Sequence, residues 1–329
     1  MTRGKRPLIV ALTLAVLAMP LTAGAQQAGR VSRIGLLLTG SPTTESRHIE
    51  TFKSGLRELG YNEGQNIAFS YRWAMGTSDQ FPVLAIDLVR ANVDLILTFG
   101  TTATTAAKKA TRTIPILFVA VGDPVGSRLV ESLARPGGNI TGFTNVSAEL
   151  SVKLLEFVKE LVPGLTRAAV LRNPANPASI PQLRQTQVAA KSLEVQLQPL
   201  EVRDPSEFES AFAAISRERA GALIVLPDPM FLSQRTRIAD LAAKSRLPSI
   251  FNWAEYVEAG GLMGYGPSLP DTLRRAASYA DRILKGAKPS DLPVEQPAKF
   301  ELIINLKTAR TLGLTIPPSL LLRVDRILD

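Results

Sequence analysis

Short apolar runs rich in β-branched residues recur along this chain, and amphipathic helical segments with short links separate them. In the first half the runs are Ile34 to Thr39, Val93 to Phe99 and Ile116 to Val121. Strands buried on both faces of a parallel sheet have this continuous apolar pattern, and their alternation with helices is typical of a sheet covered by helices on both sides. We therefore predict an α/β fold.

The same pattern begins again after Thr166. Apolar runs at Ala168 to Leu171, Ala222 to Leu226 and Pro248 to Asn252 follow those of the first half at a nearly constant spacing, although the residues themselves barely repeat. This spacing is far longer than the period of a solenoid repeat. The chain is therefore predicted to form two lobes of the same α/β topology.

Between the halves lies the segment Ile116 to Asn145. Gly122-Asp123-Pro124 ends its strand, and Val125 to Leu133 is predicted to form a short amphipathic helix. Asn139 to Asn145 is predicted to be an extended segment that leaves the first lobe. Earlier in the chain, Gly40-Ser41-Pro42 is interpreted as a polar loop and Glu50 to Leu59 as a helix.

The N-terminal residues have the pattern of an export signal. Arg3, Lys5 and Arg6 precede the apolar run Leu8 to Met19, and Ala23-Gly24-Ala25 has the spacing of a cleavage site. The run is shorter than the roughly 20 residues that span a bilayer. We expect residues 1–25 to be removed after Ala25 and the mature protein to be a free monomer in the periplasm.

The composition argues against several kinds of chemistry. The chain has no cysteine and a single histidine, His48, so disulfides, thiol nucleophiles and His/Cys metal clusters are excluded. His48 is expected at the solvated start of a helix. The first predicted strand is not followed by a G-x-G-x-x-G turn. We expect no enzyme activity, no cofactor and no metal.

The formal net charge is +9, but lysine and arginine are spread along the chain and interleaved with acidic residues. Proteins that bind nucleic acid usually concentrate basic residues in a patch or stripe. We therefore expect no nucleic-acid partner.

The predicted strands end in small or polar residues, which points to ligand binding. In an open parallel sheet these ends lie at one edge, and two lobes would face those edges across a cleft. Thr101 and Thr102 either hold a carboxylate or only cap a helix, and Asp123 either holds an ammonium group or caps the next helix. Trp253 and Tyr265 either pack on a ligand or belong to the core. The candidate ligand-binding residues are Ser41, Gly100, Thr101, Thr102, Gly122, Asp123, Asn145, Asn173, Asp228, Trp253 and Tyr265.

Several long segments resemble a known family. These are LRELGYNEGQNI, ILFVAVGDPVGSRLVESLARPGGNITG, LRNPANP, LPDP, EAGGLMGYGP and RILKGAKPSDLPVEQPAKFELIINLKTARTLGLTIPPSLL. Together they resemble the ABC-transporter substrate-binding protein family that includes tryptophan and aromatic-amino-acid binders. The resemblance runs from Arg33 to about Asp325.

This resemblance implies a type I periplasmic-binding-protein fold, in which two Rossmann-like lobes with parallel sheets, joined by a three-crossing hinge, trap a ligand. It implies a first lobe of residues 31–143 with 270–292, and a second of 144–269 with 293–329. The expected function is to bind an amino acid or related small carboxylate and to deliver it to an ABC permease in the inner membrane. A periplasmic ligand sensor shares the fold. A cleft enzyme would have to use Asp123 and Asp228 without an obvious base.

Overall fold

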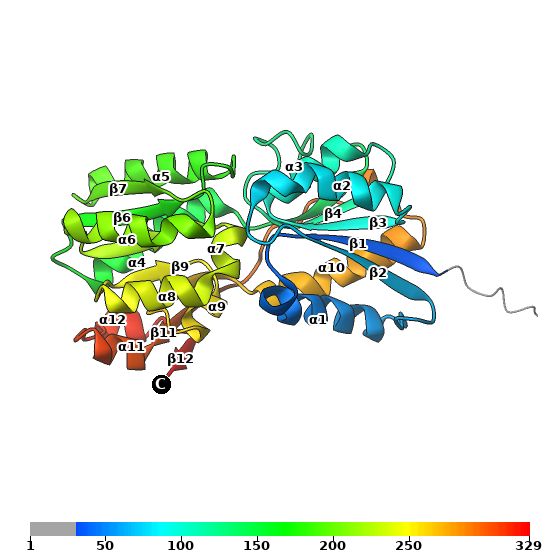
Figure 1. Ribbon diagram of the computed structural model, residues 1–329. Coiled ribbons are helices and arrows are strands. Elements are labelled where there is room, and N and C mark those ends of the chain that lie inside the picture. Colours follow the sequence, from blue (N-terminus) through cyan, green and yellow to red (C-terminus); the bar gives the residue numbers. More distant parts are fainter. Residues whose placement is uncertain (1–30) are drawn as a thin grey trace, which may run out of the picture. The chain divides into compact units, whose positions relative to one another are not determined.

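The computed structural model describes residues 31–329, so the signal segment and its expected cleavage site lie outside the described residues. Two β-sheets, each flanked by helices, organise the described chain (Figure 1). The predicted α/β class is therefore confirmed.

The first sheet has five parallel strands in the order β2-β1-β3-β4-β5. Its strands are β1 (Ser32–Leu38), β2 (Ile67–Trp73), β3 (Leu95–Phe99), β4 (Ile116–Val121) and β5 (Ile140–Thr144). The helices that pack with it are α1 (Pro42–Glu58), α2 (Phe81–Arg90), α3 (Thr101–Ala110) and, from much later in the chain, α10 (Leu269–Leu284).

Alternate residues of these strands enter two different hydrophobic cores. Leu36 and Leu97 pack in the cluster that contains α1 and α10 residues, whereas Leu37 and Ile96 pack in the cluster that contains residues of α2 and α3. Successive side chains of a strand point to opposite faces of its sheet. Both faces are covered, which explains why the strands are apolar without interruption.

The second sheet has seven strands in the order β12-β11-β10-β9-β8-β6-β7, and only the β10–β11 pair is antiparallel. Its strands are β6 (Arg167–Arg172), β7 (Gln196–Glu201), β8 (Ala222–Val225), β9 (Ser249–Phe251), β10 (Met263–Pro267), β11 (Phe300–Asn305) and β12 (Arg326–Leu328). The helices of this part of the chain are α4 (Ser147–Leu161), α5 (Ser179–Ser192), α6 (Phe208–Arg217), α7 (Pro229–Ser233), α8 (Arg235–Lys244), α9 (Ala254–Glu258), α11 (Leu306–Thr311) and α12 (Pro318–Leu321).

The chain passes between the two sheets three times. It leaves the first sheet after Thr144, returns between β10 and α10, and crosses again before β11. The third crossing runs beside the first, because the Thr144 N–H donates to the Glu295 carbonyl at 3.0 Å and the Glu295 N–H donates to Gly142 at 2.9 Å. The lobe boundaries expected from the sequence remain a prediction.

The prediction of a helix at Val125 to Leu133 is wrong, because this segment forms a series of turns. Arg128 has φ of 55°, in the left-handed region that interrupts a helix. The N–H groups of both Leu129 and Val130 donate to the Pro124 carbonyl. Leu129 and Val130 are nevertheless buried. The apolar pattern therefore predicted the burial of these side chains correctly and their secondary structure incorrectly.

Two further boundaries differ from expectation. The first helix begins at Pro42, because Ser41 and Thr44 form a capping box in the segment interpreted as a loop. The segment expected to leave the first lobe instead forms β5, the edge strand paired with β4. The chain departs only after Thr144.

Candidate functional site

The strand ends of the first sheet are tied together by short hydrogen bonds. Thr101, at the start of α3, is buried, and its Oγ1 accepts the N–H of Gly122 after β4 at 3.3 Å. After β1, the N–H of Gly40 donates to Oε1 of Glu45 at 3.2 Å. These bonds fix the positions of backbone segments at one edge of the sheet.

In the second sheet, Asp228 follows β8 and is fully buried. Its Oδ1 accepts from Asn173 Nδ2 at 3.3 Å and from the Met230 N–H at 2.9 Å, and its Oδ2 accepts from Asn176 Nδ2 at 2.8 Å. Burial raises the pKa of Asp228, and the hydrogen bonds from Asn176 and Asn173 oppose that effect. Both oxygens of this carboxyl group are therefore already engaged.

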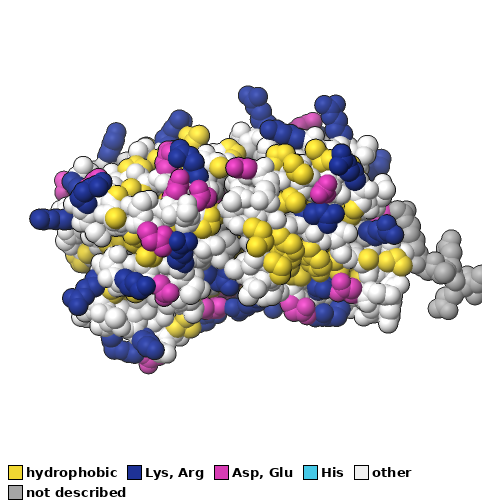
Figure 2. Space-filling view, viewed as in Figure 1, with side chains coloured by type: hydrophobic (Ala, Val, Ile, Leu, Met, Phe, Trp, Pro, Cys, Tyr) yellow, Lys and Arg dark blue, Asp and Glu magenta, His cyan; other side chains and the backbone are white. Residues whose placement is uncertain are grey.

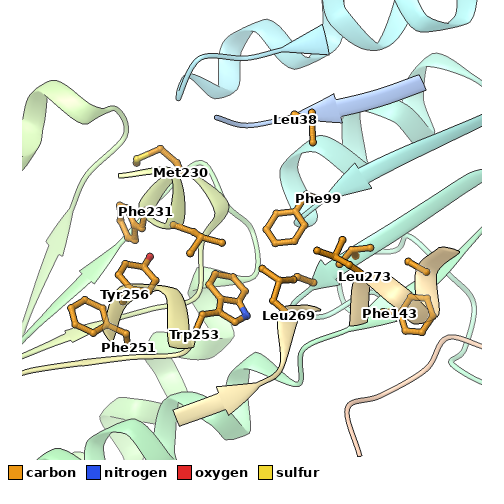
Figure 3. Close-up of a cluster of buried hydrophobic side chains, with 14 of the residues drawn as sticks. Leu38, Phe99, Phe143, Met230, Phe231, Phe251, Trp253, Tyr256, Leu269 and Leu273 are labelled. Atoms are coloured by element: carbon orange, nitrogen blue, oxygen red, sulfur yellow. The ribbon is translucent and has the colours of Figure 1, made fainter. Parts of the chain in front are cut away.

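An aromatic seam joins the ends of the two sheets (Figure 3). The rings of Phe99, at the end of β3, and Trp253, after β9, lie 6.0 Å apart between centroids, and both side chains are buried. Next to them, Gly100 has φ of 81°, and a Cβ there would lie 2.3 Å from Cγ of Pro229. The two sets of strand ends can approach this closely only because residue 100 has no side chain.

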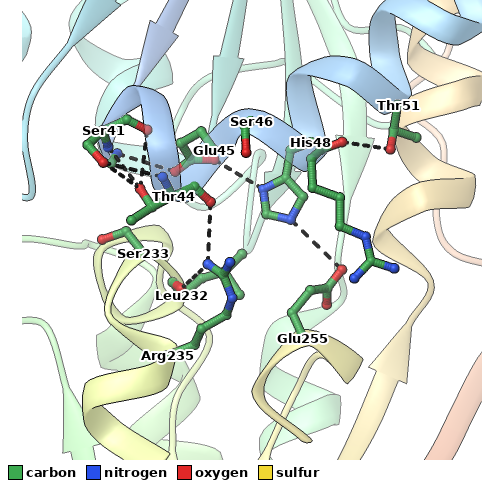
Figure 4. Close-up of polar contacts among 12 residues, drawn as sticks. Ser41, Thr44, Glu45, Ser46, His48, Thr51, Leu232, Ser233, Arg235 and Glu255 are labelled. Carbon is green, nitrogen blue, oxygen red and sulfur yellow. Dashed lines mark hydrogen bonds and ion pairs between the residues drawn. The ribbon is translucent and has the colours of Figure 1, made fainter. Parts of the chain in front are cut away.

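A polar bridge crosses the same region (Figure 4). His48 on α1 places Nδ1 3.1 Å from Glu45 Oε2 and Nε2 3.9 Å from Glu255 Oε1 on α9. Burial lowers the pKa of His48, but the nearby carboxylates of Glu255 and Glu45 outweigh burial and raise the pKa to about 9. His48 is therefore an imidazolium at neutral pH. The expected solvated position is wrong, since His48 is only 7% exposed.

Unpaired polar atoms gather at the strand ends. Among the described residues, buried side-chain atoms without a hydrogen-bond partner include Oδ1 of Asn145, both amide atoms of Asn252, Oε2 of Glu255 and the Tyr256 hydroxyl. Buried polar atoms in folded proteins are nearly always paired. Asn145 follows the last strand of the first sheet and the others follow β9. This arrangement offers donors and acceptors to a polar ligand.

Asn252, Glu255 and Tyr256 were not among the candidates from the sequence. The strand-end rule that selected Trp253 also applies to Asn252, which directly follows β9. Glu255 and Tyr256 lie on α9, a helix of five residues that has too few turns for a recognisable periodic pattern.

The structure brings several of the predicted residues together. Gly100, Thr101 and Trp253 lie at the seam, and Thr102 Oγ1 donates to the Ala175 carbonyl across it at 3.5 Å. Gly122 is bonded to Thr101, Asn173 is bonded to Asp228, and Asn145 contributes an unpaired oxygen.

Three other predicted residues have structural partners. Ser41 caps α1, and Asp123 is half-buried and accepts the Gly126 N–H at 2.7 Å within a turn. Tyr265 packs against Phe157 and Phe300 in the middle of the second sheet, with centroid distances of 4.8 and 5.7 Å. The ligand-binding roles of all the candidates remain predictions.

The hollows around the seam are of two kinds. Those lined by Glu255 and by His48 measure about 50 and about 20 Å³, room for only a few water molecules. An open groove of about 510 Å³ lies between α2 and α3 on one side and Pro174 to Ile180 on the other. A ligand the size of an amino acid therefore needs the strand ends to separate before it can reach the seam.

Among residues 31–329 there is no cluster of three or more side chains suited to a metal ion. The same part of the chain contains no helix long and apolar enough to cross a membrane.

Two mostly parallel sheets whose strand ends face each other, joined by three crossings, are the architecture of the type I periplasmic-binding-protein fold. Residues 42–327 match the model of the family described as ABC transporter substrate binding protein. The chain belongs to this family, as the resemblance in the sequence indicated.

Three similar proteins illustrate the relationship. A tyrosine-binding protein of Clostridioides difficile is 30% identical over 80% of this chain and 75% of its own length. The crystal structure of a conserved domain protein from Vibrio cholerae is 28% identical, with a TM-score of 0.84 over 91% of this chain and 100% of that one. A Streptococcus pneumoniae ABC domain in complex with L-Trp is 26% identical, with a TM-score of 0.82 over 90% of this chain and 99% of that one.

Proposed function

We propose that this protein is the amino-acid-binding component of an ABC importer and that it holds an aromatic amino acid between the strand ends of its two sheets. The observation that carries the proposal is the presence, after strand ends of the two sheets, of unpaired buried polar atoms on Asn145, Asn252, Glu255 and Tyr256 together with the paired rings of Phe99 and Trp253. An amino acid supplies donors and acceptors for the former and an apolar side chain for the latter. The tyrosine- and tryptophan-binding relatives support this ligand class.

The ligand carboxylate is expected near the start of α3. The free N–H groups and positive end of that helix favour an anion, and Thr101 and Thr102 lie in its first turn. The ring of the ligand would pack at the aromatic seam with Trp253. Contacts with both sheets exist only when their ends are close together, so ligand binding stabilises the closed arrangement.

The same proposal includes location and partner. The signal segment would direct the chain to the periplasm, where cleavage after Ala25 releases a mature protein that begins at Gln26. The closed, ligand-bound form would deliver the amino acid to the permease in the inner membrane. Family membership supports a transporter partner of this kind.

The experiment is a thermal-shift screen of the mature protein, unfolded and refolded first to remove any ligand retained from the cell. The test compounds are the standard amino acids and aromatic carboxylates without an amino group. A compound present at 100 times its dissociation constant adds about 2.7 kcal/mol to the free energy of unfolding. We expect the largest shift with tyrosine or tryptophan, confirmed by calorimetry. A protein that responds to no amino acid but to another class of solute would contradict the proposed function.

A further inference from the structure

We infer that Glu255 receives the α-ammonium group of the ligand and that His48 positions it. This inference rests on the proposed function. It means that a residue of α9 distinguishes an amino acid from an analogue without the amino group. From the sequence, Asp123 or Asp228 was the candidate partner of the ammonium group, whereas the geometry favours Glu255.

The argument begins with the buried acidic side chains. Among the described residues these are Glu45, Asp228, Glu255 and Asp281. Both oxygens of Asp228 are bonded, and those of Glu45 face Gly40 and His48. Asp281 lies on α10, where it faces Tyr61 and Lys285. Of the carboxylate oxygens in this group, Oε2 of Glu255 is the one that is fully buried and has no hydrogen-bond partner.

The surroundings of Glu255 show how it is held. A line of contacts runs from the Gly40 N–H through Glu45 and His48 to Oε1 of Glu255. Imidazolium has an N–H on each ring nitrogen, so His48 can face both carboxylates as a donor. The His48 ring thus lies at ion-pair distance from Oε1 of Glu255, and Oε2 remains for a ligand.

The polar groups around Glu255 also favour an ammonium group. Glu45, His48 and Glu255 together carry one more negative than positive charge when all three are ionised. Among the neighbouring cations, Arg47 pairs with Glu258 at 2.5 Å, and Arg235 donates to the neutral carbonyls of Thr44 and Leu232. An ammonium group, with three N–H donors, would supply the donor that Oε2 of Glu255 lacks.

The residues next to Glu255 complete the recognition of an amino acid. Asn252 and Tyr256 carry unpaired polar atoms, and Trp253 contributes its ring to the seam. One stretch of five residues thus presents an amide, an aromatic ring, a carboxylate and a hydroxyl group. An amide and a hydroxyl group can donate to a ligand carboxylate.

The test compares L-tyrosine and L-tryptophan with their des-amino analogues, in which hydrogen replaces the ammonium group, by titration calorimetry. Wild-type protein should prefer the amino acid. Glu255→Gln keeps the shape of the side chain and removes its charge, and it should weaken amino-acid binding roughly 30-fold or more while leaving the analogue nearly unaffected. The matched control is Glu258→Gln on the same helix, whose carboxylate pairs with Arg47 and Arg326 and which should keep the wild-type preference.

The role of His48 has its own readout. His48→Gln should lower the ratio of amino-acid to analogue affinity without changing analogue affinity, whereas a purely structural role would weaken both ligands equally. If Glu255→Gln does not fold, Glu255→Asp, which withdraws the carboxylate by one methylene group, takes its place and should show the same selective loss.

The outcomes separate the two proposals. A wild-type preference for the amino acid that survives in Glu255→Gln, or in Glu255→Asp where that variant replaces it, would overturn the assignment of Glu255 and leave the proposed function intact. Wild-type protein that binds neither amino acid and responds to another class of solute would overturn the proposed function itself.

Discussion

His48 illustrates how the fold changes the chemistry of one residue. Its ordinary pKa is 6.5, and in the folded protein the nearby carboxylates of Glu255 and Glu45 outweigh burial and raise the pKa to about 9. Because the folded pKa lies above the unfolded one, protonation of His48 favours the folded state. The stabilisation is fully present below about pH 6.5 and is lost as the pH rises through about 9.

We therefore expect the free energy of unfolding to decrease between these pH values by an amount on the order of 3 kcal/mol more in wild type than in His48→Gln. Deprotonation leaves Glu45 and Glu255 buried without the cation between them. Urea unfolding of both proteins at about pH 6 and about pH 10 measures the difference. Equal pH dependence in the two proteins would mean that His48 is not charged in the folded state.

The sequence could not predict this environment for His48. The spacing of Glu45 and His48 on one helix is visible in the sequence, but the second carboxylate comes from residue 255, more than half the chain away. A single histidine among polar residues is ordinarily exposed. Similarly, Asp228 was correctly placed at a strand end, whereas its pairing with Asn173 and Asn176 depends on how loops from different strands converge.

At the scale of elements, the sequence predicted best where local pattern and burial agree. The limits of α2 follow directly from its apolar spacing, and the buried runs of both halves became strands. The sequence predicted the limits of an element poorly where a polar residue starts it, as Ser41 does for α1. It also failed where a single backbone conformation prevents a helix, as the positive φ of Arg128 does. Strand order, including the place of β5 at the edge of the first sheet, depends on pairing between distant segments.

The turn between β3 and α3 provides a test at this scale. In Gly100→Ala the new Cβ would lie 2.3 Å from Pro229 Cγ, so the strand ends of the two sheets could not approach as closely. We expect this variant to fold but to lose most of the stabilisation that the amino acid gives to wild type, measured by thermal shift.

Gly60→Ala is the matched control for Gly100→Ala. Gly60 has φ of +90°, close to the +81° of Gly100, but a Cβ there meets no atom within 4 Å. Both variants should lose stability from backbone strain, Gly100→Ala more so because ψ of Gly100 is 168°, a conformation nearly restricted to glycine. Only Gly100→Ala should lose its response to ligand. Equal responses would show that the contact with Pro229 has no part in closure.

At the scale of the whole molecule, the three crossings between the sheets and the small hollows at the seam predict a change of shape. Small-angle scattering should give a smaller radius of gyration with saturating amino acid than without it, because hinge closure brings the two sheets together around the ligand. An unchanged radius, with binding confirmed by calorimetry, would indicate a rigid site.

The surface gives a complementary picture at the same scale. On the face shown in Figure 2, lysine and arginine side chains are interspersed with aspartate and glutamate. Exposed ion pairs such as Arg237 with Glu209 bring the two signs of charge together at the surface. Basic and acidic side chains are thus interspersed along the sequence and over this face.

The return of the chain to the first sheet also affects the order of folding. The face of α1 that carries Gly55 packs tightly against Ala277 of α10, and a Cβ at Gly55 would lie 2.8 Å from the Ala277 Cβ. A chain made from its N-terminus therefore completes β1 to β5 long before the helix that covers them exists. Contacts between such distant segments form slowly, because a long loop must close first. Until residues 269–284 have been synthesised, the apolar surface that they will cover stays open to water, where it can aggregate or bind chaperones.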